Sequence, residues 1–189
     1  MIEILPPDFT MERYGLFARF VNENDAVFIL KLRTDENLGR WIHSTENDVE
    51  KQKQWLREYK KRERKGEDYY FIFFKDGMPV GLNRMYHIVN TTFTTGSWIF
   101  DKEAPVECSI AASIMVRELA FEQLGFTFEH AFDGVHVNNK KVIRFNHMMG
   151  LKDIGLIEDV KGTYIQQSLT PEDFAKNKPK MLKYLGIRI

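Results

Sequence analysis

The 189-residue sequence has one cysteine, no long apolar run and no excess of charge of either sign. Cys108 alone cannot form an internal disulfide, which is typical of a reducing compartment. No apolar run approaches the roughly 20 residues that cross a bilayer, and residues 1–10 lack the basic start and apolar run of a signal peptide. Lys+Arg and Asp+Glu number 27 each, so no global field attracts nucleic acid. We therefore expect a cytoplasmic protein with neither membrane nor nucleic acid as partner.

The composition is that of an ordinary globular protein. It is 43% hydrophobic and 29% charged, which allows a substantial core and argues against disorder. Phe occurs 15 times, and because aromatic side chains bury large areas, we expect a core built on Phe. The length fits one domain better than two. We therefore expect a single domain over residues 1–189.

Apolar periodicity, caps and turn residues predict the order of the elements. Asn24 and Asn139 stand at helix starts, and Thr170-Pro171 combines a cap with proline at the first helical position. The basic side chains of the 49–65 helix could contact a phosphorylated ligand, but the interpretation as a solvated face is favoured. The predicted strands are 14–21, 68–75, 79–89, 96–100, 128–137 and one or two within 152–169; the predicted helices are 25–33, 49–65, 110–124, 140–149 and 171 to about 184.

The three strands between residues 68 and 100 are predicted to form an antiparallel meander, because Asp76-Gly77 and a polar turn separate them. The connection from 96–100 to 128–137 passes through the apolar 110–124 helix. It is long enough for a crossover between parallel strands. The sequence therefore predicts an α/β fold with a mixed, mostly antiparallel sheet.

Two segments resemble the GNAT (GCN5-related) N-acetyltransferase family. The run from Asn139 to Leu151, NKKVIRFNHMMGL, is similar to the family pattern Asn-x-x-Ala-Ile-x-Phe-Tyr-x-x-x-Gly-Phe, with matches at Asn139, Ile143, Phe145 and Gly150. AFEQLGF at 120–126 resembles the end of the helix after the family's pyrophosphate loop. The phrases LRTDENLGRWI, QKQWL and DYYFIFF…GMPVG resemble the branch of ribosomal-protein and amino-sugar acetyltransferases.

The resemblance implies a sheet of about seven strands, splayed between the fourth and fifth and flanked by helices. The helix at about 171–184 is then an appendage. It also implies an enzyme that uses acetyl-CoA as co-substrate, with no metal, and acetylates a small-molecule amine. A homodimer is compatible with the sequence.

The family holds the CoA pyrophosphate on a glycine-rich turn at a helix start, where free N–H groups and the macrodipole favour an anion. Here that turn has no glycine, and Glu107 occupies one of its places, which is unfavourable unless the carboxylate points away. Pro105 has no N–H to contribute. The residues that the resemblance assigns to the cofactor are Val106, Glu107, Cys108, Ser109 and Ile110 at the pyrophosphate, and Trp98, Ile99, Phe100, Asn139 and Phe145 along the pantetheine arm.

Two of these residues have alternative interpretations. Asn139 is either a ligand of the pantetheine arm or a plain helix cap. Cys108 at a helix start is either a reactive thiol or, as we favour, a small buried packing residue.

Acetyl transfer needs a route for the amine proton and a partner for the departing thiolate. The family's tyrosine donor is replaced by Asn146, whose amide can hydrogen-bond a thiolate but cannot protonate it. Some relatives carry a basic Glu on the fifth strand, where this chain has Gly134. His136 lies two residues on and is our candidate base, with a partly buried structural histidine as the alternative, while Asp133 is predicted to face away.

The acceptor is predicted to bind opposite the thioester, against the first two helices and their loop. Arg33 and Arg84 can hold a diphosphate or a carboxylate, and the aromatic candidates can stack on a sugar or a base. An amino sugar, in nucleotide-linked form, is favoured over a protein N-terminus. A GNAT fold that binds acyl-CoA or a partner without catalysis is the alternative from another class. The candidate acceptor residues are Arg33, Trp41, His43, Arg84 and Tyr86.

Overall fold

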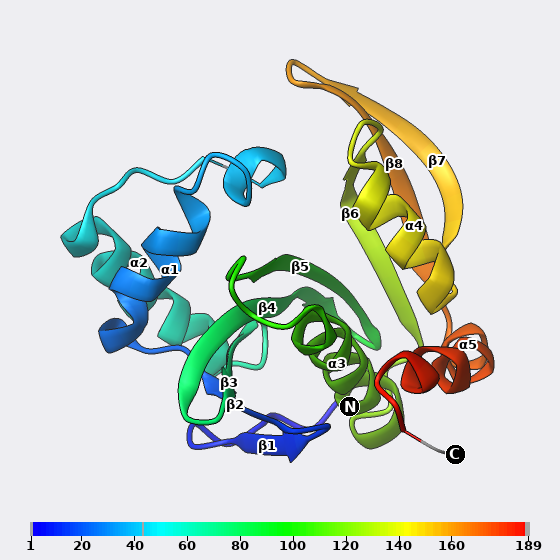
Figure 1. Ribbon diagram of the computed structural model, residues 1–189, viewed down its shortest axis with the longest axis horizontal. Helices are drawn as coiled ribbons and strands as arrows, with labels where there is room; N and C mark the ends of the chain where they lie inside the picture. Colours follow the sequence, from blue (N-terminus) through cyan, green and yellow to red (C-terminus); the bar gives the residue numbers. More distant parts are fainter. Residues whose placement is uncertain (1, 43, 188–189) are drawn as a thin grey trace.

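The structure is a computed structural model that describes residues 2–42 and 44–187. The described strands form one eight-stranded sheet in the order β1-β2-β3-β4-β5-β6-β8-β7 (Figure 1). The strands are β1 Thr10–Arg13, β2 Leu16–Phe20, β3 Tyr69–Lys75, β4 Met78–Val89, β5 Thr92–Phe100, β6 Phe128–His136, β7 Lys152–Asp159 and β8 Gly162–Leu169. The helices are α1 Ala26–Arg33, α2 Val49–Glu63, α3 Val106–Arg117, α4 Lys140–Met149 and α5 Pro171–Tyr184.

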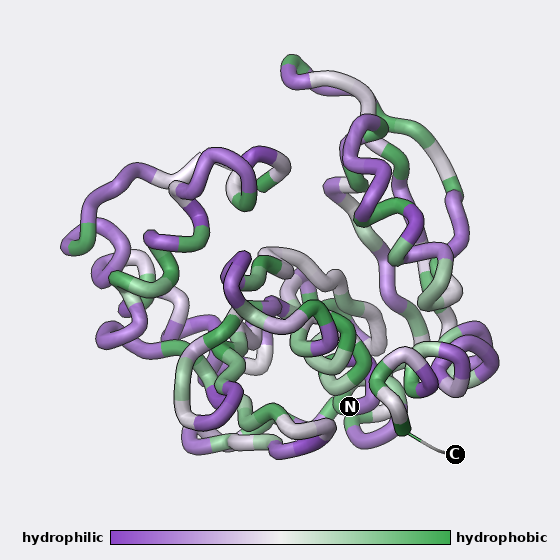
Figure 2. Tube along the Cα trace, in the orientation of Figure 1, coloured by the Kyte–Doolittle hydropathy of each residue, from purple (hydrophilic) through white to green (hydrophobic). Residues whose placement is uncertain are grey.

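Two apolar clusters lie on opposite faces of the first half of the sheet. Successive strand residues point to opposite faces, so in β3 Phe71 and Phe73 join α3 and α5, whereas Tyr70 and Ile72 join α1 and α2. Figure 2 shows the apolar α3 in the middle of the molecule and the largely hydrophilic α2 at its edge. The Phe-rich core that the composition predicts is present, since Phe71, Phe73 and Phe93 are fully buried.

Helix α2 is placed by one cap and one buried face. Asp48 accepts a hydrogen bond from the Lys51 amide at 3.0 Å, which satisfies one of the free N–H groups of the first turn. Tyr59 is fully buried and accepts from the Tyr70 amide at 2.9 Å. Lys61 pairs with Glu58 at 2.8 Å on the exposed side, in agreement with the predicted solvated face.

Several predicted boundaries differ from the structure. The β1 strand was not predicted, because its four residues TMER are mostly exposed and carry no apolar alternation. The predicted cap at Asn24 was wrong. Asn22 accepts from the Asn24 amide and caps a 3₁₀ turn, Glu23–Asp25, that leads into α1, and Asp25 at the N-cap of α1 makes no side-chain capping bond. α3 begins at Val106 rather than Ile110 and continues after Arg117 as a π-helix over Glu118–Gln123.

β5 and β6 are parallel neighbours that pair over two positions only, Thr92 with Phe128 and Phe93 with Glu129. Beyond Phe93 and Glu129 they diverge, and we call this parting the splay. The predicted mixed α/β GNAT fold is confirmed, with one strand more than the seven expected, so that the splay lies between β5 and β6. Within the described residues, no helix is both long and apolar enough to cross a membrane.

Candidate functional site

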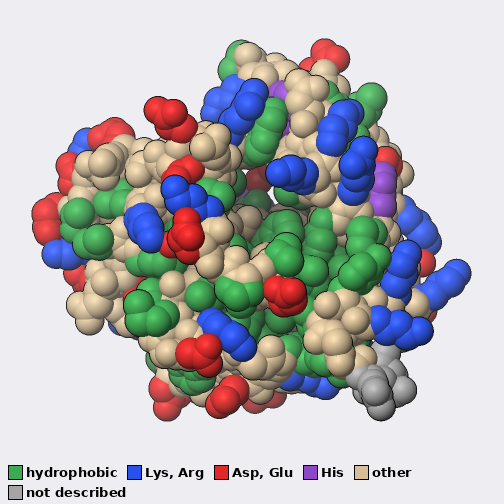
Figure 3. Space-filling view, in the orientation of Figure 1, with side chains coloured by type: hydrophobic (Ala, Val, Ile, Leu, Met, Phe, Trp, Pro, Cys, Tyr) green, Lys and Arg blue, Asp and Glu red, His purple; other side chains and the backbone are tan. Residues whose placement is uncertain are grey.

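A cleft of about 2050 Å³ opens along the splay. Figure 3 shows the hollow near the middle of the face drawn, with Lys and Arg side chains along part of its rim. Its walls are β4, β5, β6, the start of α4 and the segment between α1 and α2. The predicted site residues that line it are Arg33, Trp41, Arg84, Tyr86, Trp98, Ile99, Phe100, His136, Asn139, Phe145 and Asn146. His43 lies outside the described residues.

A β-bulge in β5 shapes the floor of the cleft. Leu82 pairs with Ile99 and Arg84 with Gly96, so two β5 residues, Ser97 and Trp98, oppose Asn83 alone. Ser97 has a φ of +48°, in the left-handed region that is unusual outside glycine. A bulge leaves its extra residue unpaired and bends the strand, so β5 presents free backbone groups here.

Gly96 and Asn83 lie next to this bulge. Gly96 lies beneath the Tyr86 ring, where a Cβ would stand 2.8 Å from the ring edge. The Asn83 side chain is 1% exposed, and its Oδ1 has no hydrogen-bond partner among the described residues. A buried acceptor without a partner is costly, so Asn83 offers a ligand an unused hydrogen-bonding position at the floor of the cleft.

A buried ion pair stands at the vertex of the splay. Arg117 of α3 donates to Glu129 of β6 through Nε at 2.8 Å and through Nη2 at 2.7 Å. Thr95 of β5 donates to Glu129 at 2.6 Å, and Thr94 donates to the His130 carbonyl at 2.5 Å. These contacts hold β5, β6 and α3 together at the point where the pairing of β5 with β6 ends.

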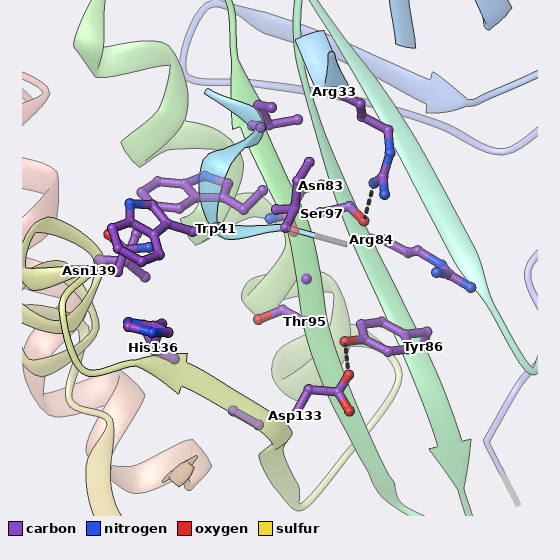
Figure 4. Close-up of a pocket in the computed structure, with 18 of the residues that line it drawn as sticks. Arg33, Trp41, Asn83, Arg84, Tyr86, Thr95, Ser97, Asp133, His136 and Asn139 are labelled. Carbon is purple, nitrogen blue, oxygen red and sulfur yellow. Dashed lines mark hydrogen bonds between the residues drawn. The ribbon is translucent and has the colours of Figure 1, made fainter. Parts of the chain in front are cut away.

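The side of the cleft next to α3 and α4 carries two stacked rings. Trp98 and Phe145 lie with their centroids 4.4 Å apart and their planes 22° apart, and Trp98 Nε1 donates to the Ser109 carbonyl at 3.0 Å. Asn139 stands at the N-cap position of α4, but its side chain makes no capping hydrogen bond. Since Asn139 lines the cleft (Figure 4), the structure favours the ligand interpretation over the plain cap.

The start of α3 lies outside the cleft lining. The Cys108 amide donates to the Pro105 carbonyl at 2.9 Å, so of the first-turn amides those of Val106 and Glu107 are left without an intrahelical acceptor. Glu107 and Cys108 line a smaller pocket of about 220 Å³ together with Lys75. Glu107 is exposed and lines this smaller pocket rather than the cleft.

Cys108 is a packing residue in this structure. Its side chain is 4% exposed and belongs to the core between the sheet and α3. Burial raises the pKa of the Cys108 thiol, whereas a reactive thiol requires a lowered one. The structure therefore favours the packing interpretation over a nucleophilic one.

Asp133 enters the cleft, against the prediction that it faces away. β6 and β8 pair Ala131 with Gln167 and Val135 with Ile165, so two extra residues bulge from β6 and break the alternation on which the prediction depended. Asp133 accepts a hydrogen bond from the Tyr86 hydroxyl at 3.0 Å (Figure 4). Burial, and then the Asp133 carboxylate, raise the pKa of Tyr86, so Tyr86 is a neutral donor that holds the carboxylate in place.

Gly134 cannot host the acid that some relatives carry at its position. Its φ is +67°, and a Cβ would stand 2.9 Å from both the Ile165 carbonyl oxygen and the Tyr164 Cβ. Glycine adopts this φ without cost, and a side chain here would also meet the neighbouring strand β8. The acidic side chain of this segment therefore stands one residue earlier, at Asp133.

The two candidate arginines are engaged within the protein. Arg84 donates to the buried Asp68 through Nε at 2.8 Å and Nη2 at 2.5 Å, a bidentate geometry that fixes the guanidinium. Arg33 donates to Thr45 at 2.7 Å and to Ser97 at 3.3 Å, so it connects α1 to the following loop and to the bulge. Both line the cleft, with part of their hydrogen-bonding capacity already used.

His136 lies at the rim of the cleft in a packed position. Its ring centroid is 4.7 Å from that of Trp41 and 5.1 Å from that of Tyr164. Nδ1 accepts a hydrogen bond from the Asn138 amide at 3.1 Å, and a neutral imidazole with that acceptor role carries its proton on Nε2. No lone pair is then left for an amine proton, so the geometry favours the structural interpretation of His136 over the catalytic one.

Asn146 is also engaged. Its side chain is 9% exposed and donates to Gln167 at 2.7 Å, and Gln167 in turn donates to Asp153 at 2.7 Å. Its contact with a thiolate stays a prediction. Within the described residues, no group of three His, Cys, Asp or Glu side chains is arranged to hold a metal ion.

The bulges in β5 and β6 were not predicted, although a glycine inside each of these strands indicates them. An isolated glycine in a strand indicates a bulge or a close approach, and Gly96 and Gly134 mark the two bulges of the site. Interpreted as the mark of a bulge, Gly134 predicts that the alternation of side chains fails in β6. Asp133 then becomes a candidate residue of the cleft. No local signal marks Glu129 or Arg117, because their pairing joins different elements.

The splay, the bulged strand beside it and the cleft between them define the architecture of a GNAT-type acyltransferase. The sequence pattern of the acetyltransferase (GNAT) domain family matches residues 16–152. The chain therefore belongs to the GNAT acetyltransferase family, as the resemblance predicted. No curated protein sequence matches the chain.

Solved structures with the same fold include one of substantial sequence identity. The apo structure of FdhC, a nucleotide-linked sugar GNAT, is 33% identical over 95% of this chain and 99% of its own, with a TM-score of 0.80. RimJ of Mycobacterium smegmatis, in complex with CoA-disulfide, is 16% identical over 94% and 92%, with a TM-score of 0.77. Ribosomal-protein-S5-alanine acetyltransferase from Vibrio fischeri is 15% identical over 88% and 99%, with a TM-score of 0.74. The latter two similarities concern the fold alone.

Proposed function

We propose that this chain transfers the acetyl group of acetyl-CoA to the primary amine of an amino sugar carried by a nucleotide. The observation that supports it most is the splay, because an open strand edge accepts an extended, amide-bearing ligand as an added strand. β5 has such an edge beyond Phe93, beside a helix start with free amides. The similarity to FdhC, a nucleotide-linked sugar GNAT, supports the choice of acceptor.

Several residues around the splay suit the chemistry of acetyl-CoA. Asn83 offers an unused buried acceptor, Asn139 an uncommitted amide, and the Trp98–Phe145 stack an apolar wall. The amides of Val106 and Glu107 would hold the pyrophosphate. Acetyl-CoA supplies the activated acetyl thioester; the chain supplies position and a route for the proton.

Asp133 takes the role of base in this proposal. Tyr86 donates to Oδ2 of its carboxylate, which leaves Oδ1 for the acceptor's ammonium group. The carboxylate attracts the cation and accepts one proton, the neutral amine attacks the thioester carbonyl carbon, and the carbon–sulfur bond breaks as the nitrogen loses its second proton to solvent. CoA leaves as thiolate and takes a proton from solvent, and Asp133 releases its proton to solvent, so the net products are the amide, the thiol and one proton.

Two alternatives are kept because particular residues motivate them. A GNAT fold that binds acyl-CoA or a partner without catalysis is motivated by the glycine-free helix start and by Asn146, which stands where the family has tyrosine and is engaged with Gln167. Acetylation of a protein N-terminus is motivated by the shared fold of the ribosomal-protein acetyltransferases.

Calorimetry with acetyl-CoA, followed by a thiol-release assay, separates these functions. The acceptors are a nucleotide-linked amino sugar, the free amino sugar and a peptide with a free N-terminus. Binding with thiol release on the nucleotide-linked sugar is expected. Binding without release on any amine would favour the non-catalytic alternative, release on the peptide alone would favour the protein acceptor, and absence of binding would remove all three.

A further inference from the structure

Three aromatic rings from distant segments meet at the rim of the cleft. Trp41 comes from the 3₁₀ turn Gly39–Trp41 between α1 and α2, His136 from the end of β6, and Tyr164 from β8. The centroids of Trp41 and His136 are 4.7 Å apart with a tilt of 35°, and those of His136 and Tyr164 are 5.1 Å apart, edge to face. All three line the cleft, and Figure 4 shows Trp41 and His136 side by side at its edge. We call them the rim aromatics.

The rim aromatics are held firmly on the β6–β8 side. The Asn138 amide donates to His136 Nδ1 at 3.1 Å. Gly162 supports the ring from behind, since a Cβ there would stand 2.8 Å from His136 Nε2. Trp41 comes from a short turn with no buried residue and contacts the His136 ring directly. The three rings thus form a preformed aromatic surface. β6 and β8 hold two of the rings, and the surface turn between α1 and α2 holds the third.

Two cations accompany the rings. The Arg40 guanidinium carbon lies 4.7 Å from the centre of the Trp41 ring, and Lys161 lines the cleft next to Gly162. Both are exposed, and within the described part of the chain neither forms an ion pair, whereas Lys51, also at the cleft, pairs with Glu46. Aromatic rings beside cations that are not held by a carboxylate suit a ligand that joins a planar ring to negative charge.

The rim aromatics lie on the acceptor's side of the sheet. Trp41 follows α1, and α1 and α2 cover one face, whereas α3 covers the other. The CoA pyrophosphate is assigned to the start of α3, so the adenosine of CoA belongs on that opposite face. A planar, anionic ligand at Trp41 is therefore part of the second substrate.

We infer that the rim aromatics, with Arg40 and Lys161, bind the nucleoside diphosphate portion of the acceptor. The base stacks on the Trp41 indole in place of the Arg40 guanidinium, which turns with Lys161 to neutralise the diphosphate. The sugar then extends inward to Tyr86 and Asp133. This inference rests on the proposed function, because it assumes that the acceptor enters from this face. It adds a binding site for the nucleotide. Contacts at this site increase the affinity for a nucleotide-linked amino sugar relative to the free sugar.

The test is calorimetric titration of nucleoside diphosphates without any sugar into protein saturated with CoA. The probes are UDP, dTDP, CDP and GDP, with inorganic pyrophosphate as the baseless control. At least one diphosphate is expected to bind while CoA is bound, with an affinity that falls as salt increases, and pyrophosphate is expected to bind more weakly. Trp41→Ala should weaken this binding about tenfold to a hundredfold, the range for loss of one base–aromatic stack.

Matched variants separate this site from general effects. Arg40→Ala with Lys161→Ala should weaken diphosphate binding and reduce its salt dependence. Arg64→Ala with Lys65→Ala removes two exposed charges outside the cleft and should change neither. Affinity for acetyl-CoA should be the same in all variants, which also controls for folding.

The outcomes distinguish this inference from the proposed function. No binding of any diphosphate, full competition by CoA, or unchanged binding in both Trp41→Ala and the double variant would overturn the inference. Thiol release on an amino sugar without diphosphate binding would overturn it and leave the proposed function in place. Diphosphate binding lost in the Trp41 variant, in a protein that releases no thiol from any amine, would support the site and contradict the proposed catalysis.

Discussion

Replacing Glu129 by Gln tests whether the Arg117–Glu129 ion pair at the vertex of the splay is closed to water. The substitution keeps the shape of the side chain and removes its charge. The side chains of Arg117 and Glu129 are 4% and 1% exposed, and three donors converge on the carboxylate, at 2.6, 2.7 and 2.8 Å. The Arg117 cation would then stay buried with only neutral acceptors around it.

The expected loss follows from that burial. Removing one partner of a buried ion pair costs about 3–5 kcal/mol, because the remaining charge stays out of water. For a chain of this size that corresponds to a fall in Tm of roughly 6–20 °C. The matched control is Glu58→Gln, which breaks a pair with Lys61 whose side chains are 57% and 62% exposed and should cost about 0–1 kcal/mol.

Urea denaturation of both variants gives the two free energies of unfolding directly. A double variant, Arg117→Leu with Glu129→Leu, should lose less than Glu129→Gln alone, because no charge is left buried. A loss below about 1 kcal/mol for Glu129→Gln, equal to that of Glu58→Gln, would show that water reaches the pair and would refute this reasoning.

Three further predictions concern the base, the buried tyrosines and a close approach. Asp133→Asn should lower kcat/KM for the acceptor about a hundredfold, within the usual range for acid–base groups, with an unchanged KM for acetyl-CoA in steady-state kinetics. Burial raises the pKa of Tyr59, Tyr70 and Tyr86, so their stabilising contribution is complete below about pH 10 and is lost as pH rises further; ultraviolet titration should show them ionising together with unfolding. Gly81→Ala would place a Cβ 2.2 Å from the Phe100 ring and should cost about 1–3 kcal/mol in urea denaturation.

Each of these predictions has a control and a contrary outcome. Glu67→Gln, at an exposed carboxylate of the same cleft, should leave the kinetics unchanged; an equal fall in both variants would remove Asp133 as base. Ionisation of all tyrosines near pH 10 in the folded protein would contradict their burial. Gly155→Ala meets only the end of a glutamine side chain at 3.3 Å, so an equal loss there would argue against the Phe100 contact as the cause.

Elements with local end signals could be predicted from the sequence. α4 and α5 have the predicted bounds, because Thr170 caps one start, Pro171 occupies the first helical position and Gly150 ends the other helix at a φ of +103°. α3 begins earlier than predicted, directly after Pro105, and Glu107 in its first turn is favourable at the positive end of the helix dipole.

The geometry of the site could be predicted only where strand alternation holds. The bulge at Ser97 and the two extra residues before Val135 interrupt it, and the second of these brings Asp133 to Tyr86. The stacking of Trp41 on His136 joins residues 95 positions apart, and nothing local in either segment specifies it. A family resemblance located the splay, but side-chain roles within it depend on these tertiary contacts.

Hydrogen exchange with and without acetyl-CoA tests the central claim, that the cofactor occupies the parted strands, most directly. Acetyl-CoA should slow exchange in peptides that cover 94–100 of β5 and at the amides of Val106 and Glu107, because those groups gain hydrogen-bond partners. Peptides from β1 and β2, far from the splay in the sheet order, should exchange at unchanged rates. Unchanged exchange across 94–100 at saturating acetyl-CoA, or protection confined to other strands, would contradict the account.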